Sequence, residues 1–327
     1  MATTSTSAPM PTVPNDNVAN GKALENKAVQ VKASQDKAAQ EKDLIHMRAL
    51  SPSELPPHPS LSNETSTVTL RAFASTLLAQ GSAFLTTELS DSGSFKAKGS
   101  PRASGGSAAK VQVYAFERRG AAARPEAWFA RVSRHDAEAR SGCASLAEFD
   151  FGLRQDHSRH EGEYTPDVFD VNVVLDYGAV EGVQGWEGVG VSVVEMAHKI
   201  PFPLLNRVFA VVVVSGKNKD GFVVVQVPVR LEAVQAARYS NGANKKDASL
   251  KGLQKKGVVI GEYVSIERCR QEGNEIIWEM ATASDAKGSL PMALQKPALP
   301  GKITLDVGLF IDWIEKQRTK QEATNGH

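Results

Sequence analysis

Runs of β-branched and aromatic residues dominate the second half of the chain, and they predict a series of β-strands. The polar segments between them are rich in Gly, Asn and Asp, and two of these, GKNKDG and QEGN, have the composition of hairpin turns. Strands joined by a hairpin are antiparallel. The sequence therefore predicts about six antiparallel strands, at residues 168–177, 187–198, 207–215, 221–230, 258–270 and 274–284.

Apolar residues at helical spacing appear on both sides of this block of strands. A first helix is indicated by one apolar face, which consists of Leu70, Phe73, Leu77, Leu78 and Phe84. Two strands, 111–119 and 126–135, and a mostly helical segment, 144–161, follow it. A final amphipathic helix is indicated by Ile303, Val307, Phe310, Ile311 and Ile314. This order predicts an α+β fold in which helices cover a curved antiparallel sheet.

The most apolar strands do not alternate between apolar and polar residues. VFAVVVV and FVVVQVPV are apolar on both faces, whereas a sheet with one solvated face alternates. Both faces of these strands are therefore predicted to lie out of water. Two arrangements explain this pattern: a sheet curled around one helix with a second helix or loop outside it, or a dimer interface.

The folded domain is predicted to span residues 62–320. Residues 1–61 are expected to be a disordered or partly helical tail and linker, because a Thr-, Ser- and Pro-rich start is followed by a solvated Lys/Ala/Gln segment and a proline-rich stretch. Residues 321–327 are expected to be a disordered end. Within the domain, residues 90–110 are predicted to be a mobile loop, and the lysine-rich residues 240–257 a solvated loop rather than a lipid headgroup patch.

Composition and charge argue against several classes of protein. The chain of 327 residues carries 38 basic and 37 acidic side chains, so its net charge gives no electrostatic reason to bind nucleic acid or an anionic membrane. Cys143 and Cys269 lack partners at metal-ligand spacing, which favours two reduced thiols. The N-terminus has no secretory pattern, and no apolar run is long enough to span a membrane. We therefore expect a protein of the cytosol, or of the cytosolic side of a membrane.

One carboxylate lies within the apolar strand pattern. Glu195 shares its strand face with three valines, Val189, Val191 and Val193, and therefore points inward if that face is the inner one. An unpaired buried carboxylate is costly, and Arg207, at the start of the next strand, is the expected partner. The pair is interpreted either as an ion pair at the end of the sheet or as a polar anchor inside a ligand cavity.

Catalytic and metal-binding patterns are weak in this sequence. His157, His160 and Glu161 share a helix face, but their order differs from the zinc-peptidase motif, so a solvated or hydrogen-bonded cluster is favoured over a metal site. Ser133 and His135 share a strand face without a third residue to orient the histidine. We therefore predict no catalytic residue, no metal and no cofactor.

Several segments of the sequence follow one another in the order found in a known family. EMAHKIPFPLLNRVF resembles the proline turn and arginine-containing strand of the steroidogenic-acute-regulatory-related lipid-transfer (START) domains. A larger set resembles the fungal START-like family known as domain of unknown function 3074; it comprises WFARVSRH, DHSRHEGEYTP, EMAHKIPFPLLNRVF, YVSIER, WEMATASDAKGSLPMALQ and DVGLFIDWI. The resemblance runs from about residue 63 to residue 318.

This resemblance implies a helix-grip fold, in which a strongly curved antiparallel sheet surrounds a long C-terminal helix and leaves a tunnel for a hydrophobic ligand. Residues 303–320 correspond to the gripping helix, and Arg207 corresponds to the arginine of the turn-and-strand segment. Val208 stands where many members have an acidic residue, so their local salt bridge is not assumed for this chain.

The expected function is non-enzymatic binding, transfer or sensing of a lipid or sterol in an internal cavity, with transient membrane contact. Its candidate cavity residues are Trp128, Trp186, Glu195, Met196, Arg207, Phe209, Trp278, Met280 and Phe310. Two alternatives stay open. One is an interaction module whose core is filled by side chains. The other is a small-molecule enzyme on the same fold, in which Glu195 and His198 serve an acid–base reaction. The oligomeric state is also left open.

Overall fold

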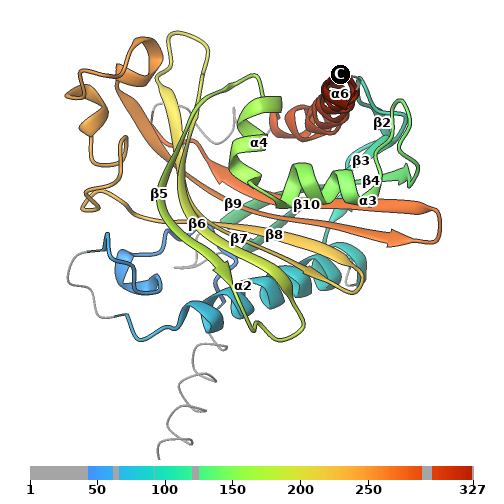
Figure 1. The fold of residues 1–327 in the computed structure, drawn as a ribbon, viewed down its shortest axis with the longest axis horizontal. Coiled ribbons are helices and arrows are strands. Elements are labelled where there is room, and N and C mark those ends of the chain that lie inside the picture. The colour runs from blue at the N-terminus through green and yellow to red at the C-terminus, as the bar shows by residue number, and fades with distance from the viewer. Residues whose placement is uncertain (1–42, 62–65, 92, 120–124, 289–296, 326–327) are drawn as a thin grey trace, which may run out of the picture. The chain divides into compact units, whose positions relative to one another are not determined.

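The computed structural model describes residues 43–61, 66–91, 93–119, 125–288 and 297–325. The predictions for residues 1–42 lie outside this part of the chain. The strands are β1 Lys96–Ala97, β2 Arg102–Ala103, β3 Lys110–Arg119, β4 Pro125–Asp136, β5 Val168–Val180, β6 Glu187–His198, β7 Asn206–Asn218, β8 Gly221–Pro228, β9 Val258–Glu272 and β10 Glu275–Asp285. The α-helices are α2 Leu70–Phe84, α3 Leu146–Phe149, α4 His157–Tyr164 and α6 Leu299–Asn325 (Figure 1).

Shorter helical turns complete the secondary structure. π-Helical turns extend α2 and separate α3 from α4, at Leu85–Asp91 and Asp150–Arg154. Single 3₁₀ turns occur at Pro52–Glu54, Ala243–Lys245 and Gly252–Lys255.

The strands form one sheet in the order β1-β3-β4-β10-β9-β8-β7-β6-β5, with β2 paired to β3. Every pairing between these strands is antiparallel except one, in which the start of β7 runs parallel to the start of β9, with Asn206 opposite Val258. Both predicted hairpins, β7–β8 and β9–β10, are confirmed. The predicted α+β fold, a curved antiparallel sheet with a long C-terminal helix, is confirmed as well.

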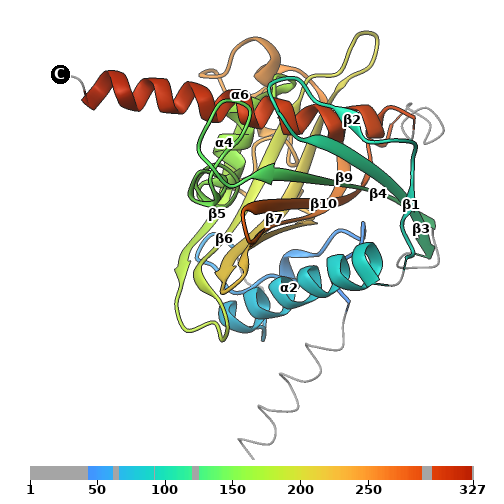
Figure 2. The same cartoon turned by 90° about the vertical axis from the view of Figure 1, so that its right-hand side faces the viewer.

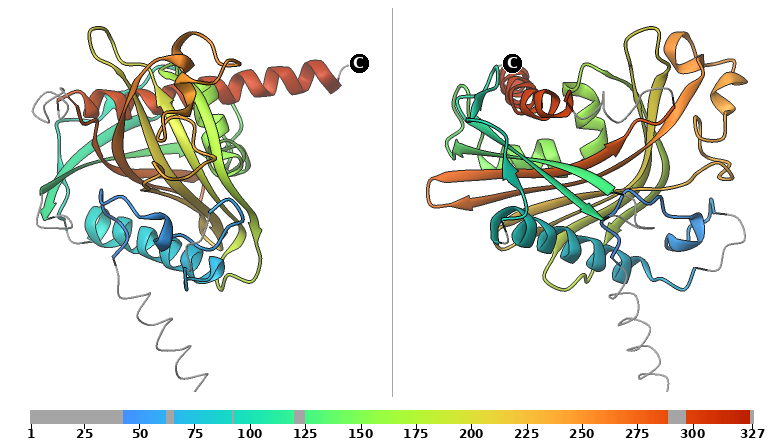
Figure 3. Two further views of the ribbon diagram at one scale, coloured as in Figure 1. Left: turned by 90° about the vertical axis from the view of Figure 1, so that its left-hand side faces the viewer. Right: turned by 180° about the vertical axis from the view of Figure 1, so that it is seen from behind.

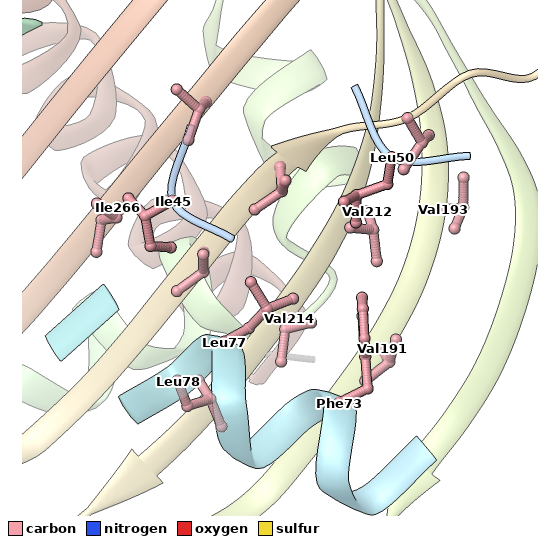
Figure 4. Close-up of a cluster of buried hydrophobic side chains, with 14 of the residues drawn as sticks. Ile45, Leu50, Phe73, Leu77, Leu78, Val191, Val193, Val212, Val214 and Ile266 are labelled. Carbon is pink, nitrogen blue, oxygen red and sulfur yellow. The ribbon is translucent and has the colours of Figure 1, made fainter. Parts of the chain in front are cut away.

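The two apolar faces of the central strands have different covers. Helix α2 lies on one face, while α3, α4 and α6 lie on the other (Figures 1 and 2). On β7, Val212 and Val214 belong to the α2-side core (Figure 4). Val211 and Val213 belong to the α6-side core. Helices on both faces therefore account for the absence of apolar–polar alternation in β7 and β8 within a single chain.

The folded domain begins earlier than predicted. Residues 43–61 were expected to belong to the tail and linker, yet Ile45, Leu50 and Leu55 are each at most 1% exposed and pack into the α2-side core. Figure 4 shows Ile45 and Leu50 in this core. Leu50 forms a parallel bridge with Val229. Polar residues and Pro52 separate these apolar side chains, and three more prolines follow Leu55, so the composition resembles that of a linker. The boundary at residue 62 is therefore wrong, and the domain starts at Asp43.

Residues 90–110 are also more structured than predicted. They were expected to be a mobile loop, but β1 and β2 within them pair with β3. Ser104 attaches this segment to α6, because its hydroxyl donates to the Thr304 carbonyl at 2.7 Å and accepts from the Gly308 N–H at 2.8 Å. A regular α-helix joins these two backbone groups to each other. A Cβ at Gly308 would overlap the carbonyl oxygen of Gly105, so glycine is required for this close approach.

Helix α6 is longer than predicted at its C-terminal end. The predicted disordered end began at residue 321, whereas α6 continues to Asn325. The helix runs across the sheet beside α4, and the whole of α2 lies on the opposite face (Figures 2 and 3). Ile303, Val307, Phe310, Ile311 and Ile314 are all buried, as their spacing predicted.

Candidate functional site

A cavity of about 570 Å³ lies between α6, α4 and the sheet face that they cover. Its wall is largely apolar and includes Met196, Phe209, Val211, Trp278, Met280 and Leu309. The lining residues that are exposed to solvent mark its mouth: Pro166 and Asp167 before β5, Pro201 in the β6–β7 loop, and Ala298, Lys302 and Leu305 around the start of α6. The cavity is therefore an apolar chamber whose opening is bordered by these three segments.

Strand parity and register determine which side chains reach the cavity. Met196 of β6 lies opposite Phe209 of β7 in the antiparallel register, so both side chains project from the same face. On β10, Trp278 and Met280 are two residues apart and share that face. The large apolar residues of these three strands thus converge under α6.

The wall of the cavity contains a buried ion pair. Arg131 of β4 is 1% exposed, and its Nη2 donates to the Glu267 Oε1 at 2.9 Å. The guanidinium carbon also lies 3.8 Å from the centroid of a Trp278 ring, which adds a cation–π contact. Three further polar atoms of this group have no hydrogen-bond partner among the described residues: Nε and Nη1 of Arg131 and Oε2 of Glu267.

Two more carboxyl groups face the cavity, and their pKa values are raised. Burial raises the pKa of Asp306 to about 7; Arg131 and Lys302 oppose this shift, while the charges of Glu161 and Glu267 add to it. Burial also raises the pKa of Glu161, which lies 3.5 Å from the Nε2 of His157. Neutral carboxylic acids donate hydrogen bonds as well as accept them, so the state of this cluster depends on pH.

Arg207 lies at the cavity wall but does not pair with Glu195, so the predicted ion pair is wrong. Its Nε donates to the Ala286 carbonyl at 2.5 Å and its Nη2 to the Lys287 carbonyl at 3.2 Å, while Nη1 donates to the Leu205 carbonyl. Arg207 therefore joins the start of β7 to the segment after β10 at the edge of the cavity.

Glu195 lies on the other face of the sheet. It is fully buried and accepts hydrogen bonds from the backbone N–H groups of Arg238 at 2.7 Å, Tyr239 at 3.1 Å and Ser240 at 2.7 Å. The Nδ2 of Asn172 donates to it at 2.9 Å. These donors replace Arg207 as its partners. His198 lines the cavity, so the suggested acid–base pair of Glu195 and His198 is separated by the sheet.

Five of the nine candidate cavity residues line the cavity: Met196, Arg207, Phe209, Trp278 and Met280. Trp128 does not, because it points to the α2 side and packs against Phe84 at 4.5 Å between ring centroids. Trp186 also packs against the α2-side core. Phe310 is fully buried in the α6-side core and stacks on Phe149. For these three residues and Glu195, the predicted position at the cavity is wrong.

The remaining histidine candidates occupy structural positions. The Nε2 of His135 lies 2.8 Å from the Ser133 Oγ, and burial lowers the pKa of His135 to about 4. His160 packs against Phe151 and Trp313. No group of three His, Cys, Asp or Glu side chains within the described ranges is placed to hold a metal ion. Cys143 and Cys269 are buried and free.

Arg131, Glu267 and Asp306 line the cavity but were not predicted from the sequence. Arg131 shares its strand face with Ser133 and His135 as well as Phe129, and Glu267 shares its face with Ser265 and Gln271 as well as Cys269. Neither charge therefore interrupts an apolar face, whereas Glu195 does. Asp306 also gave no signal, because an acidic residue beside an apolar helix stripe is usually solvated.

No helix among the residues described is both long and apolar enough to cross a membrane. The expected cytosolic location remains a prediction.

Solved structures with low sequence identity are similar to this chain. Human StAR-related lipid transfer protein 5 is 13% identical over 76% of this chain and 100% of its own, with a TM-score of 0.47. Human STARD10 is 13% identical over 75% of this chain and 84% of its own, with a TM-score of 0.46. A fragment of a STAR-related lipid transfer protein from Xanthomonas axonopodis is 15% identical over 68% of this chain and 99% of its own, with a TM-score of 0.43. Identities and TM-scores this low leave fold and function to be argued from the chain itself.

By sequence, the chain matches a family profile but no curated protein. A family profile described as protein of unknown function (DUF3074) matches residues 128–314, which is more than half of the chain and contains most of β4, all of the strands from β5 to β10 and half of α6. The chain therefore belongs to the DUF3074 family.

Proposed function

We propose that this protein binds a hydrophobic ligand, a lipid or sterol, in the cavity between α6 and the sheet, and that it does so without catalysis. The observation that carries this proposal is the cavity of about 570 Å³ with a largely apolar wall. Small-molecule sites have volumes of this order, and burial of apolar ligand surface contributes roughly 25 cal/mol per Å². The mouth between the β6–β7 loop and α6 supplies a route of entry.

Filling the cavity is expected to abolish uptake. Met196 is 3% exposed and belongs to the wall, so Met196→Trp places a larger side chain in the ligand space. We expect binding of the neutral fluorescent probe N-phenyl-1-naphthylamine to weaken at least tenfold, at a stability cost of about 1–3 kcal/mol for overpacking. Fluorescence titration measures the affinity, and thermal unfolding measures the cost.

Val173→Trp is the matched control, because Val173 is 56% exposed on β5 and lies outside the cavity lining. Its uptake should equal that of the unchanged protein. If the unchanged protein takes up no probe and contains no extractable lipid in native mass spectrometry, the proposal fails. The alternative of an interaction module with a filled interior then gains support.

We further propose that the mouth of the cavity contacts membranes during ligand exchange. Three of the most exposed large apolar side chains lie at or beside it: Phe202 at 96%, Leu205 at 55% and Leu305 at 54%. Lys199 and Lys302 are exposed near them along the chain. An apolar tip flanked by cations suits the surface of an anionic bilayer.

Phe202→Asp is expected to weaken binding to vesicles of phosphatidylcholine and phosphatidylserine by about tenfold or more, because burial of a phenylalanine contributes roughly 1.5–3 kcal/mol. Sedimentation with vesicles measures the partition. Val173→Asp introduces the same charge at an exposed valine on β5 and should leave the partition unchanged. Equal losses in the two variants would point to a general charge effect and contradict a role for the mouth.

A further inference from the structure

Four carboxyl groups line the cavity, and one of them, Asp167, is 54% exposed and pairs with Lys302. The other three come from different elements: Glu161 belongs to α4, Glu267 to β9 and Asp306 to α6. Their charges influence one another, since Glu161 and Glu267 both raise the pKa of Asp306. A chamber with an apolar wall thus contains a concentrated set of acidic groups.

This acidic set is not balanced by the cations nearby. Arg131 pairs with Glu267 through one nitrogen. The Nε and Nη1 of Arg131 and the second carboxylate oxygen of Glu267 have no hydrogen-bond partner among the described residues, and both residues are buried. Neither Asp306 nor Glu161 forms an ion pair with Arg or Lys within the described part of the chain. Within the described ranges, the buried oxygen of Glu267 thus has no hydrogen-bond donor, which is unusual for a native carboxylate.

Most of the other titratable groups that line the chamber either have partners outside the three carboxyl groups or are uncharged near pH 7. Lys302 pairs with Asp167 at 3.4 Å, and both side chains are more than half exposed. The guanidinium of Arg207 donates to backbone carbonyls. Burial lowers the pKa of His198 to about 4, and burial raises the pKa values of Tyr164 and Tyr263, so all three are neutral near pH 7. His157 faces Glu161 at 3.5 Å.

We propose that the ligand of this cavity is an amphiphile with a primary amine, whose ammonium group is held by Glu161, Glu267 and Asp306. An ammonium group has three hydrogen-bond donors and no acceptor, which matches three carboxyl acceptors. Its charge offsets the acidic excess, because the Arg131–Glu267 pair is already close to neutral. A ligand carboxylate would add a fourth acidic group, and an alcohol would leave the excess uncompensated. This inference rests on the proposed function and specifies the class of ligand.

Matched ligands test this proposal on the full chain. We expect decylamine to bind at least tenfold more tightly than 1-decanol near pH 7.5, and decanoate to bind most weakly, in calorimetric titrations below the solubility limit of the alcohol and the critical micelle concentrations of the two ionic ligands. The affinity for decylamine should rise between about pH 6 and pH 8 as Asp306 ionises, while the affinity for 1-decanol stays constant. Below about pH 7, amine binding should also release protons to the buffer.

Asp306→Asn should reduce the preference for the amine over the alcohol at least fivefold, and a circular dichroism spectrum equal to that of the unchanged protein would show that the variant is folded. Asp312→Asn is the control on the same helix, because Asp312 is exposed and lies outside the chamber. Binding of 1-decanol without a preference for decylamine would overturn the amine assignment and keep the proposed function. Failure of all three ligands to bind would overturn both.

Discussion

Replacing Glu195 with leucine is expected to lower the free energy of unfolding by about 4 kcal/mol, because three backbone N–H groups lose their acceptor in a buried site. The carboxylate is fully buried and closes the loop at Arg238, Tyr239 and Ser240 onto β6. A buried N–H without a partner costs about 1–3 kcal/mol. The total destabilisation therefore depends on how far the loop rearranges to expose these groups to water. Urea unfolding followed by circular dichroism measures the change.

Two controls separate charge from packing at this site. Glu195→Gln keeps one acceptor oxygen and the shape of the side chain, and should lose about half as much stability. Glu187→Gln removes a charge from an exposed residue of the same strand and should change stability by less than about 0.5 kcal/mol. A loss below about 1 kcal/mol for Glu195→Leu would contradict the hydrogen-bonding role of this carboxylate.

Replacing Arg131 with methionine is expected to destabilise the protein by about 3–5 kcal/mol, because the charge of Glu267 is then buried without a partner. Arg131 is 1% exposed, so water does not substitute for the lost guanidinium. The contact with the Trp278 ring is lost in the same variant. Chemical unfolding near pH 7 measures the change.

The double variant provides the decisive comparison. Arg131→Met combined with Glu267→Leu replaces the ion pair with apolar side chains, and should recover at least about 2 kcal/mol of the loss in the single variant. A double-mutant cycle with Glu267→Leu alone gives the coupling energy between the two side chains. Additive effects of the two substitutions would mean that the pair is not coupled, despite the 2.9 Å contact.

The strands and their pairing were predictable because each carries a local signal. β-Branched runs bounded by turn residues marked β5 to β10 within a few residues of their ends, and the turn chemistry defined two hairpins. The apolar pattern on both faces of β7 and β8 also predicted two covers. Sequence alone left open whether the second cover came from the same chain, and the structure identifies it as α2.

The error at Glu195 has a specific physical origin. Its parity with Val189, Val191 and Val193 was correct, but a sheet that is buried on both faces has two inner faces, and parity does not say which one borders the cavity. The predicted pairing of Glu195 with Arg207 was wrong for a related reason. Glu195 accepts hydrogen bonds mainly from backbone N–H groups of a distant loop, and almost every residue type has such a donor, so the sequence does not reveal these partners.

The N-terminal segment and residues 90–110 were misjudged because their contacts are long-range. In residues 43–61, Ile45, Leu50 and Leu55 are buried, and the backbone of Leu50 forms hydrogen bonds with Pro228 and Arg230. Gly, Ser and Lys dominate residues 90–110, a composition typical of mobile loops, although Ser104 contacts a helix two hundred positions away. The secondary-structure propensities of amino acids describe local preferences and give no information about contacts between residues far apart in the sequence.

The attachment of Ser104 to α6 bears on how a ligand leaves the chamber. Ile303, Leu305, Asp306 and Leu309 lie on the stretch of α6 that the serine holds, and all four border the chamber. An outward swing of this stretch either breaks both hydrogen bonds of the serine or carries the β1–β3 edge of the sheet with it. If the chamber binds a ligand as proposed, the release rate of that ligand would depend on a peripheral edge of the sheet that is not part of the chamber wall.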